Sequence, residues 1–376
     1  MVVEFNSSTN SFVGGCFRVA GWSFGWLVLV EGCWGRVEVA FVNLGDNLAD
    51  PLSGVVGSDA DKHVRLLGQA VAAEAAGFDL FLLGEHHFSD YVFSSPVTAL
   101  AAVAQVTSRI RLGTGVSLLP ARDPVFVAEE FATLDVLSGG RAEIAVGRGI
   151  FSNVYESLGL SMDQSVEILD EFVELLQGLL GDEPVTWKGK WRPPVEGLVV
   201  RPRPLQVPIP LWTASSSPST IELSARLGLA VMWIGVVTPV GALTGLAERY
   251  LAAWAEAGRA REDAQLGLAF HYHVARTSQE ARARFWPHYK NYFDAVTPPG
   301  VRAKLDLESI FDSVAVCGSS AEVVERIEER RDRLGLTRVV LAVDMGGLGE
   351  EEVMEVIELT GAEVLPALGC RGVLGG

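Results

Sequence analysis

The chain has 376 residues, enough for one large domain, two average domains or a single α/β barrel with insertions. Its 30 Lys and Arg residues against 47 Asp and Glu residues give a formal net charge of −17, which excludes nucleic acid and anionic membranes as partners in the absence of a local basic patch. The sequence contains no such patch. Its four cysteines are far apart and form no CxxC pair, which argues against a zinc site or a disulfide framework and favours a reducing cytoplasm.

The first 36 residues differ in composition from the rest. Residues 7–15 are polar and glycine-rich, and residues 22–30 form an apolar run that is too short to span a bilayer. A single preceding basic residue, Arg18, does not make the n-region of a signal peptide. We expect residues 1–36 to be an extension outside the fold, 37–368 to be one domain and 369–376 to be a short tail.

From Val37 onward, short apolar runs alternate with segments of helical period. The expected strands are 37–42, 80–83, 110–119, 142–146, 209–214, 229–234, 266–274 and 338–343. The expected helices are 61–76, 96–107, 124–137, 162–180, 219–227, 242–257, 279–293, 321–334 and 350–365. Each of the eight strands is followed by a helix, a pattern that favours a (β/α)₈ TIM barrel over an open doubly wound sheet.

Two stretches interrupt this alternation. Residues 187–191 have the pattern of a hairpin turn, and the proline-rich residues 201–210 that follow read as an extended connector, so we expect an insertion after the fourth strand. Residues 297–319 begin with Thr-Pro-Pro-Gly and are expected to be irregular. That second stretch is long enough to act as a lid.

Polar residues gather where the expected strands end. Glu85, His86 and His87 follow the second strand, Arg122 and Asp123 follow the third, Arg148 follows the fourth, and residues 215–220 follow the fifth. The carboxyl ends of parallel strands meet at one rim of a barrel, where active sites are built.

The clearest physical signal at this rim is an anion site. Ser217, Pro218, Ser219 and Thr220 open a helix, whose free N–H groups and dipole favour a phosphate group. Arg148 lies between two glycines at the neighbouring strand end and supplies a cation. The alternative interpretation is ordinary N-capping by serine with proline in the first turn.

His86 and His87 are adjacent at a strand end, so their side chains point in opposite directions and do not readily share one metal ion. One of them can face the barrel mouth as a proton donor or acceptor, because the histidine pKa lies near neutrality. The alternative is a half-buried histidine that holds its loop through Glu85.

His271 and His273 form a second pair, and their spacing on a strand places both on one face. With His86 they could form part of a metal site, which keeps a metal-dependent hydrolase open as an alternative. Such a site needs a further carboxylate or histidine, and the late strands offer only Asp344.

Taken together and in order, several motifs resemble the bacterial luciferase-like family of flavin-dependent monooxygenases and oxidoreductases. They are Gly-Glu-His-His-Phe at 84–88, residues 118–125, Leu-Asp-Val-Leu-Ser-Gly-Gly-Arg at 134–141, Gly-Arg-Gly at 147–149, residues 216–220, Ala-Arg-Leu-Gly-Leu at 225–229 and residues 352–366. The resemblance covers nearly all of 37–368.

The resemblance implies a (β/α)₈ barrel with an insertion after the fourth strand, a homodimer, and reduced FMN or a deazaflavin bound at the carboxyl face. It implies that Arg148, Ser217 and Thr220, with Ser216 beside them, hold the flavin phosphate. It places His86 near the reactive edge of the flavin. It also implies a non-prolyl cis peptide at Gly115–Val116, against which the flavin ring packs.

By the same resemblance, a separate reductase delivers reduced FMN, which reacts with O₂ to a C4a-hydroperoxide that oxidises a small organic substrate while His86 manages protons. Two residues depart from the luciferase α chain: Ser216 replaces a glutamate and Gly147 replaces a cysteine. Light emission is therefore not expected. A deazaflavin-dependent dehydrogenase and a flavin-binding protein without catalysis remain alternatives.

Overall fold

The computed structural model describes residues 20–21, 26–27 and 36–369. By its contacts the chain divides into two units, Met1–Arg36 and Val37–Gly376. In the first unit, strands β1 (Ala20–Gly21) and β2 (Trp26–Leu27) pair antiparallel. The extension expected over residues 1–36 and the tail expected over 369–376 otherwise lie outside the described residues.

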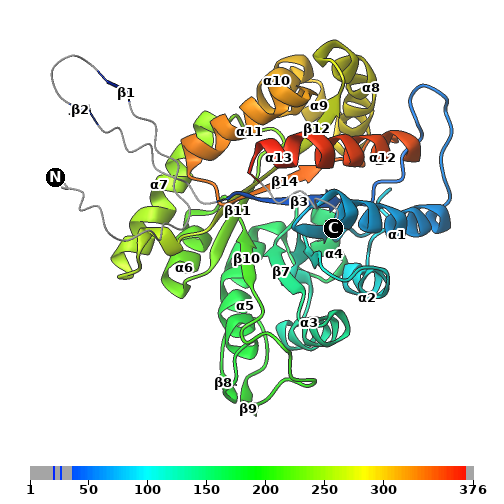
Figure 1. Cartoon of the computed structure of the whole chain (residues 1–376). Coiled ribbons are helices and arrows are strands. Elements are labelled where there is room, and N and C mark those ends of the chain that lie inside the picture. Colours follow the sequence, from blue (N-terminus) through cyan, green and yellow to red (C-terminus); the bar gives the residue numbers. More distant parts are fainter. Residues whose placement is uncertain (1–19, 22–25, 28–35, 370–376) are drawn as a thin grey trace. The chain divides into compact units, whose positions relative to one another are not determined.

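The second unit contains a closed barrel of eight parallel strands, which Figure 1 shows at the centre of the surrounding helices. The strands are β3 (Glu38–Asn43), β4 (Leu80–Leu83), β5 (Arg111–Thr114), β7 (Ala142–Gly147), β10 (Leu211–Ala214), β11 (Ala230–Ile234), β12 (Leu266–Ala275) and β14 (Arg338–Ala342). Pairing of β10 with β7 closes the ring. The predicted (β/α)₈ barrel is confirmed.

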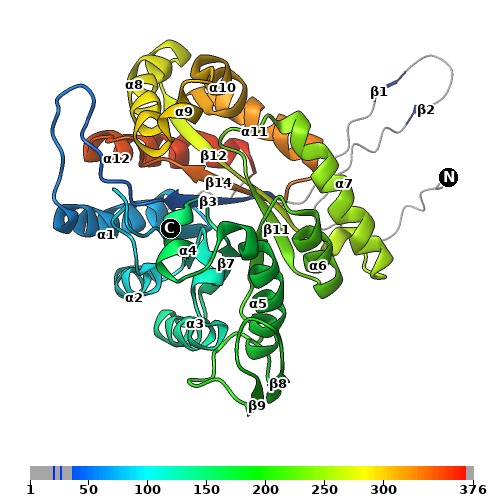
Figure 2. The same cartoon turned by 180° about the vertical axis from the view of Figure 1, so that it is seen from behind.

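Helices cover the outside of the barrel, as both views show (Figures 1 and 2). The long ones are α1 (Asp59–Ala76), α2 (Pro96–Val106), α3 (Pro124–Ser138), α5 (Ser165–Leu179), α6 (Pro218–Leu227), α7 (Val240–Glu256), α8 (Ser278–Val296), α11 (Ser320–Leu334) and α12 (Glu350–Leu359). No helix in the described part of the chain is both long and apolar enough to cross a membrane.

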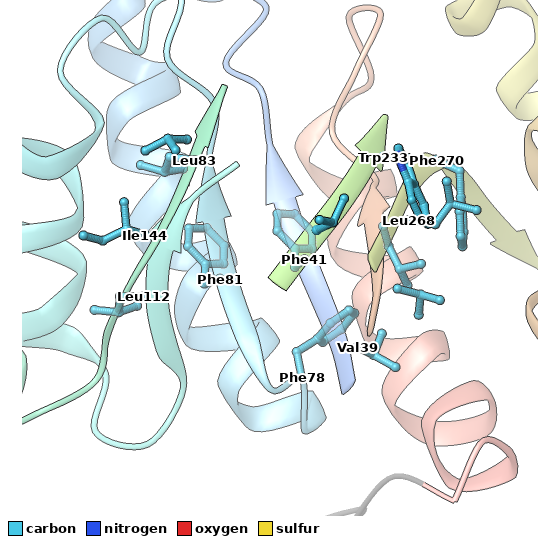
Figure 3. Packing of buried hydrophobic residues seen from close by; sticks show 14 of the residues in the cluster. Val39, Phe41, Phe78, Phe81, Leu83, Leu112, Ile144, Trp233, Leu268 and Phe270 are labelled. Atoms are coloured by element: carbon cyan, nitrogen blue, oxygen red, sulfur yellow. The ribbon is translucent and has the colours of Figure 1, made fainter. Parts of the chain in front are cut away.

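Residues of each barrel strand alternate between the helices outside and the barrel interior. Outward-facing rings pack closely: the Phe41 and Phe81 rings stack 5.2 Å apart, and Phe78 meets Phe41 edge-on at 6.0 Å (Figure 3). A separate cluster fills the interior and contains many small side chains. It consists of Ala40, Val42, Leu80, Leu82, Ala145, Trp212, Ala230, Met232, Ala269, Val340 and Ala342.

Charged residues close the amino end of the barrel. Arg338, at the start of β14, bonds to Glu143 and lies 2.6 Å from Glu38, while Arg111 lies 3.2 Å from Glu143. The Arg338 guanidinium also covers the Trp212 ring at 3.9 Å. The side chains of Arg338 and Glu143 are only 5% and 3% exposed, so each charge depends on the other for compensation.

The expected third strand, 110–119, is divided in two. β5 ends at Thr114, and the short strand β6 (Ser117–Leu118) then pairs with β7. The Gly115–Val116 peptide between them is cis, as the family resemblance implied. Gly115 and Val116 are held by β4 and the loop after it, because Gly115 N–H donates to the Leu83 carbonyl and the Val116 carbonyl accepts from Glu85 N–H.

The prediction that residues 297–319 are irregular is wrong. The segment contains α9 (Pro299–Arg302), α10 (Leu307–Val314) and β13 (Val316–Ser319), which pairs with the end of β12. Buried Leu307, Phe311 and Val314 recur at helical spacing along α10, and the Phe311 ring packs edge-on against Tyr289 of α8. The prolines that suggested a loop only open α9.

The insertion expected after the fourth strand is present. Between α5 and β10 the chain forms an antiparallel hairpin of β8 (Val185–Trp187) and β9 (Val195–Leu198). A short helix that the sequence pattern did not predict, α4 (Ser152–Ser157), lies between β7 and α5. The remaining short helices are η1 (Leu119–Ala121), η2 (Met162–Gln164), η3 (Arg261–Asp263), the π-helical η4 (Thr360–Val364) and α13 (Leu365–Ala367).

Replacement of Arg338 by methionine tests the charged cluster. Because Arg338→Met leaves Glu143 buried without its main cation, we expect the free energy of unfolding to fall by about 3–5 kcal/mol. Lys290→Met, which breaks an exposed ion pair with Asp294, should change it by less than about 1 kcal/mol. Urea unfolding of both variants checks this, and equal small effects would show that the cluster does not need its arginine.

Candidate active site

An anion cradle forms where β7 and β10 end side by side. Gly147 and Ala214 are register partners at these strand ends, so Arg148 and the serine-rich start of α6 leave the barrel from neighbouring positions. Both also contact α5: Arg148 Nη1 lies 3.4 Å from Ser165 Oγ, and Thr220 Oγ1 lies 2.6 Å from Asp170 Oδ1. The structure therefore brings together the two halves of the predicted phosphate site.

Arg148 is half-buried and has no carboxylate partner among the residues that the structure describes. Its backbone is fixed, because the Tyr155 hydroxyl of α4 donates to the Arg148 carbonyl. Most partly buried arginines form ion pairs. An unpaired guanidinium held at a helix N-terminus is therefore a ready cation for a bound phosphate group.

The first turn of α6 supplies hydrogen-bond donors. Ser217 is the N-cap residue, but its side chain caps no backbone N–H and instead lies 3.0 Å from the Ser219 hydroxyl. Backbone N–H groups of a first helical turn have no partner within the helix, which leaves those of Ser219 and Thr220 available to an anion. Ser216 is exposed beside them.

Thr220 is placed differently from the other cradle residues. Its side chain is fully buried, and its hydroxyl donates its only proton to Asp170. In this arrangement the Thr220 hydroxyl ties α6 to α5, and Thr220 offers a phosphate its backbone N–H.

The floor of the barrel mouth is apolar and nearly without bulky side chains. Val116 and Ala214 pack on the interior cluster, and Val116 also contacts Gly147. A Cβ atom at Gly147 would lie 2.9 Å from Val116 Cγ2, too close for any other residue without rearrangement. This close contact favours glycine at position 147. A flat apolar floor beside an anion cradle suits a planar ring that carries a phosphate tail.

His86 follows β4, whose partner strand β5 leads into Gly115 and Val116. Its ring stacks on Tyr91 with 3.9 Å between centroids and meets Phe151 edge-on at 6.0 Å. Its Nδ1 is buried and has no hydrogen-bond partner in the described structure. Burial lowers the pKa of His86 to about 4, so the imidazole is neutral at pH 7 and can either accept or donate a proton.

Glu85 holds the loop that carries His86. Its carboxylate accepts hydrogen bonds from His87 Nε2 at 2.9 Å, Ser117 Oγ at 2.6 Å and Leu118 N–H at 3.2 Å, with Arg122 at 3.4 Å. Burial opposes the charge, but these contacts together keep the pKa of Glu85 below its usual value. The sequence suggested that one of the two histidines holds its loop through Glu85. That histidine is His87, and His86 makes no such contact in the described structure.

A cavity of about 550 Å³ lies beside His86. Tyr91, His87 and Asn47 line it together with His86. Phe88, also in its wall, has a positive φ of 57°, which is uncommon outside glycine, and its ring is 71% exposed. His86 thus lines a space large enough for a small organic molecule.

The His271 and His273 pair does not join His86. The His271 ring is enclosed edge-on by Tyr289, Tyr292 and Phe293, and burial lowers its pKa to about 3. His273 stacks on Phe285 instead, 5.0 Å away. Among the described residues no group of three or more His, Cys, Asp or Glu side chains could hold a metal ion, so the metal-dependent hydrolase has no ligand set there.

Three residues of the site escaped sequence reasoning. Tyr155 lies on the helix that was not predicted, Ser165 sits at the start of α5, and Tyr91 lies in a loop. Only Tyr91 had a local signal, since it follows the Glu-His-His motif by a few residues.

Comparison with known proteins decides the family. A profile described as luciferase-like monooxygenase matches residues 40–338. The chain belongs to this family. Limonene 1,2-monooxygenase of Rhodococcus erythropolis is 32% identical over 271 residues, 69% of each chain. The oxygenase component of the flavin-dependent trigonelline monooxygenase of Acinetobacter baylyi is 27% identical over 327 residues, covering 78% of this chain and 87% of that one.

A solved structure agrees with this assignment. Monooxygenase RslO1 from Streptomyces bottropensis superposes with a TM-score of 0.79 and 26% sequence identity over 88% of this chain and 99% of that one. This member of the luciferase-like family is thus a flavin-dependent oxidoreductase of the monooxygenase type, and its cradle and floor suit a flavin or a deazaflavin.

Two substitutions separate the residues of the cradle by their structural roles. Thr220→Val removes the donor to Asp170, so we expect the free energy of unfolding without flavin to fall by about 1–3 kcal/mol. Ser217→Ala removes a hydroxyl that caps nothing and should change it by less than about 0.5 kcal/mol. Urea titrations of the two variants measure the difference, and equal losses would contradict the Thr220–Asp170 tie.

Proposed function

We propose that this protein is the oxygenase component of a two-component monooxygenase that uses reduced FMN and O₂ on a small organic substrate. The observation that carries the proposal is Arg148, which has no carboxylate partner among the described residues and lies beside the N–H groups at the start of α6 and an apolar floor. Reduced flavin supplies the redox chemistry: one oxygen atom of O₂ enters the substrate and the other leaves as water.

The chain's own residues would bind the cofactor, exclude water and transfer protons. Arg148, Ser217 and the N–H groups at the start of α6 would hold the phosphate, with Ser216 and the Thr220 backbone beside them. The Gly115–Val116 segment and its small neighbours would receive the ring and exclude water beneath it. The neutral His86 would accept or donate a proton at its unpartnered Nδ1.

Apolar side chains at the rim support an apolar or carbonyl-bearing substrate. Phe88 and Ile150, which follow β4 and β7, are 71% and 78% exposed. Contact with an apolar molecule would remove this surface from water. The trigonelline relative is named an oxygenase component, which supports a separate flavin reductase as partner of this chain.

A deazaflavin-dependent dehydrogenase is the alternative activity, because the same cradle would accept the phosphate of either cofactor. A flavin-binding protein without catalysis is the alternative without activity. We place the protein in the cytoplasm, where the buried free thiol of Cys317 would stay reduced. The catalytic domain is proposed to span residues 37–368.

We also propose a homodimer formed through α2 and α3. The exposed face of α2 has no charged residue, and Phe126 and Leu137 are exposed three turns apart on α3. Two chains that each carry a net charge of −17 repel one another, so the uncharged face of α2, beside the half-buried Glu129 and Glu130 of α3, is where a second copy can approach.

Anaerobic titration with reduced FMN tests the cofactor. We expect saturable binding that Arg148→Ala weakens at least tenfold, because a charge-assisted phosphate contact is lost. Arg302→Ala, which removes an arginine that pairs with Asp294 on α8, should leave the affinity unchanged. Binding of the deazaflavin alone would replace FMN as cofactor, and an unchanged affinity in Arg148→Ala would remove the arginine from the phosphate site.

The role of His86 is tested after flavin binding has been measured. In His86→Ala we expect FMN to bind within about threefold of wild type, because the imidazole is not in the cradle, while oxygen-dependent product formation falls by about 10²-fold or more. Product yield per flavin oxidised is the readout. Full turnover with bound flavin would falsify the proton-transfer role.

The proposed dimer is tested with Phe126→Glu. A charge at this site should shift the species in sedimentation velocity from dimer to monomer, because two carboxylates would meet in an apolar contact. Val64→Glu, at an exposed valine of α1, is the matched control and should remain dimeric. A monomeric wild type at micromolar concentration would exclude the dimer.

A further inference from the structure

A buried junction joins three of the loops around the barrel mouth. In it the backbone of Asp46, after β3, pairs antiparallel with that of Tyr91, after β4. The Asp46 Oδ2 accepts the N–H of Gly346, after β14, at 2.7 Å. The side chain of Asp46 therefore lies where the first, second and eighth loops meet.

The Asp46 carboxyl group is buried and incompletely paired. It is 1% exposed, and its Oδ1 has no hydrogen-bond partner among the described residues. Buried polar atoms are rarely left without a partner unless they have a further role. The nearest cation, Lys62 of α1, is already bonded to Asp344 at 2.7 Å and so compensates Asp46 only from a distance.

Two phenols complete the surroundings of this carboxyl. Tyr91 donates to the Tyr292 hydroxyl of α8 at 2.8 Å, and Asp46 and Tyr91 are directly opposed in an antiparallel bridge, which places their side chains on one face. His288 of α8 faces the same junction through the Gly346 carbonyl, 3.1 Å from its Nδ1. The titratable and charged groups that face Asp46 are thus Lys62, Asp344, His288 and the tyrosine pair.

Tyr91 connects this junction to the candidate active site. Its hydroxyl is held by Tyr292, while the face of its ring stacks on His86 with 3.9 Å between centroids and 14° between planes. Since His86 Nδ1 has no hydrogen-bond partner among the described residues, the stack on Tyr91 and the edge-on contact with Phe151 are the ring contacts that orient the imidazole.

We propose that Asp46 is a positioning residue of the site, whose carboxyl sets the place of Tyr91 and, through the ring stack, of the His86 imidazole, in a manner that depends on whether it carries a proton. The inference rests on the proposed function for the chemical role of His86. The coupling between Asp46 and His86 is a property of the chain without cofactor.

The dependence on protonation follows from the direction of the hydrogen bonds that the Asp46 carboxyl group can form. A neutral carboxyl can donate from Oδ1 to a phenol oxygen, whereas a carboxylate can only accept from a phenol O–H. In this structure Oδ1 bonds to neither phenol among the described residues, so its protonation state decides which hydrogen bond could form if the tyrosine pair moved within reach of it. Burial raises the pKa of Asp46 to about 6, with the charge of Lys62 opposing, so this change of protonation falls within the ordinary working range of a protein.

The test is NMR of the histidine ring carbons in the flavin-free protein, with the His86 signal assigned by His86→Gln. In wild type we expect this signal to shift with a midpoint near pH 6, although His86 itself is already neutral there. In Asp46→Asn, which keeps an acceptor for Gly346 and cannot ionise, the shift should be lost. Asp50→Asn, in the same loop, should retain it.

A second variant covers the case in which Asp46→Asn does not fold. Tyr91→Leu keeps Asp46 but removes the stacked ring, so the His86 shift near pH 6 should again be lost. The proposal is overturned if wild type shows no shift, or if the shift persists in either variant. Because no flavin is present, these outcomes are independent of whether the protein binds FMN or oxidises a substrate.

Discussion

The barrel mouth depends on one buried carboxylate, that of Glu85. The end of β4, the start of β6 and the side chain of Arg122 all converge on it. Gly115 and Val116 lie between two segments that this carboxylate fixes, so the apolar floor and the histidine loop are placed by the same group. His87 is drawn away from the mouth by the same contact, which leaves His86 to face it.

Polar groups at the two ends of the barrel differ in how far partners satisfy them. At the amino end, Arg338 and Glu143 satisfy each other, and stability is the result. At the carboxyl end, Arg148 lacks a carboxylate among the described residues, and buried atoms of His86 and Asp46 have no hydrogen-bond partner. Unsatisfied polar groups reduce stability, and buried ones also occur away from this rim, as at Trp191, Thr244 and Tyr289; those at the rim are available to a ligand.

Local pattern was sufficient for most of the fold. Strands and helices of the barrel follow from apolar period and from turn residues, because a buried strand and an amphipathic helix leave different repeats in the sequence. The error at 297–319 arose because Pro298, Pro299 and Gly300 were given more weight than the helical spacing of Leu307, Phe311 and Val314. The break at Gly115–Val116 followed from family resemblance and not from the pattern of apolar residues.

Less of the site could be predicted from the sequence, because its contacts join residues of different elements. Arg148 and Ser217 could be placed at one rim from strand order alone, but the hydrogen bond that commits Thr220 to Asp170 joins residues on different helices. Asp46 has the sequence context of an ordinary turn residue beside Gly45. Only the meeting of three loops shows that its carboxyl is buried beside two phenols.

The charged residues that close the amino end of the barrel determine from which side ligands approach. Because Arg338 and its partners close that end, a ligand of the barrel would approach from the carboxyl end. A flavin bound as proposed, with its ring on the floor, would lie deeper than the substrate, so it would bind first and leave last. Substrate and oxygen would then share the approach past Phe88 and Ile150, and a bulky substrate there would delay both the arrival of oxygen and the exchange of the cofactor.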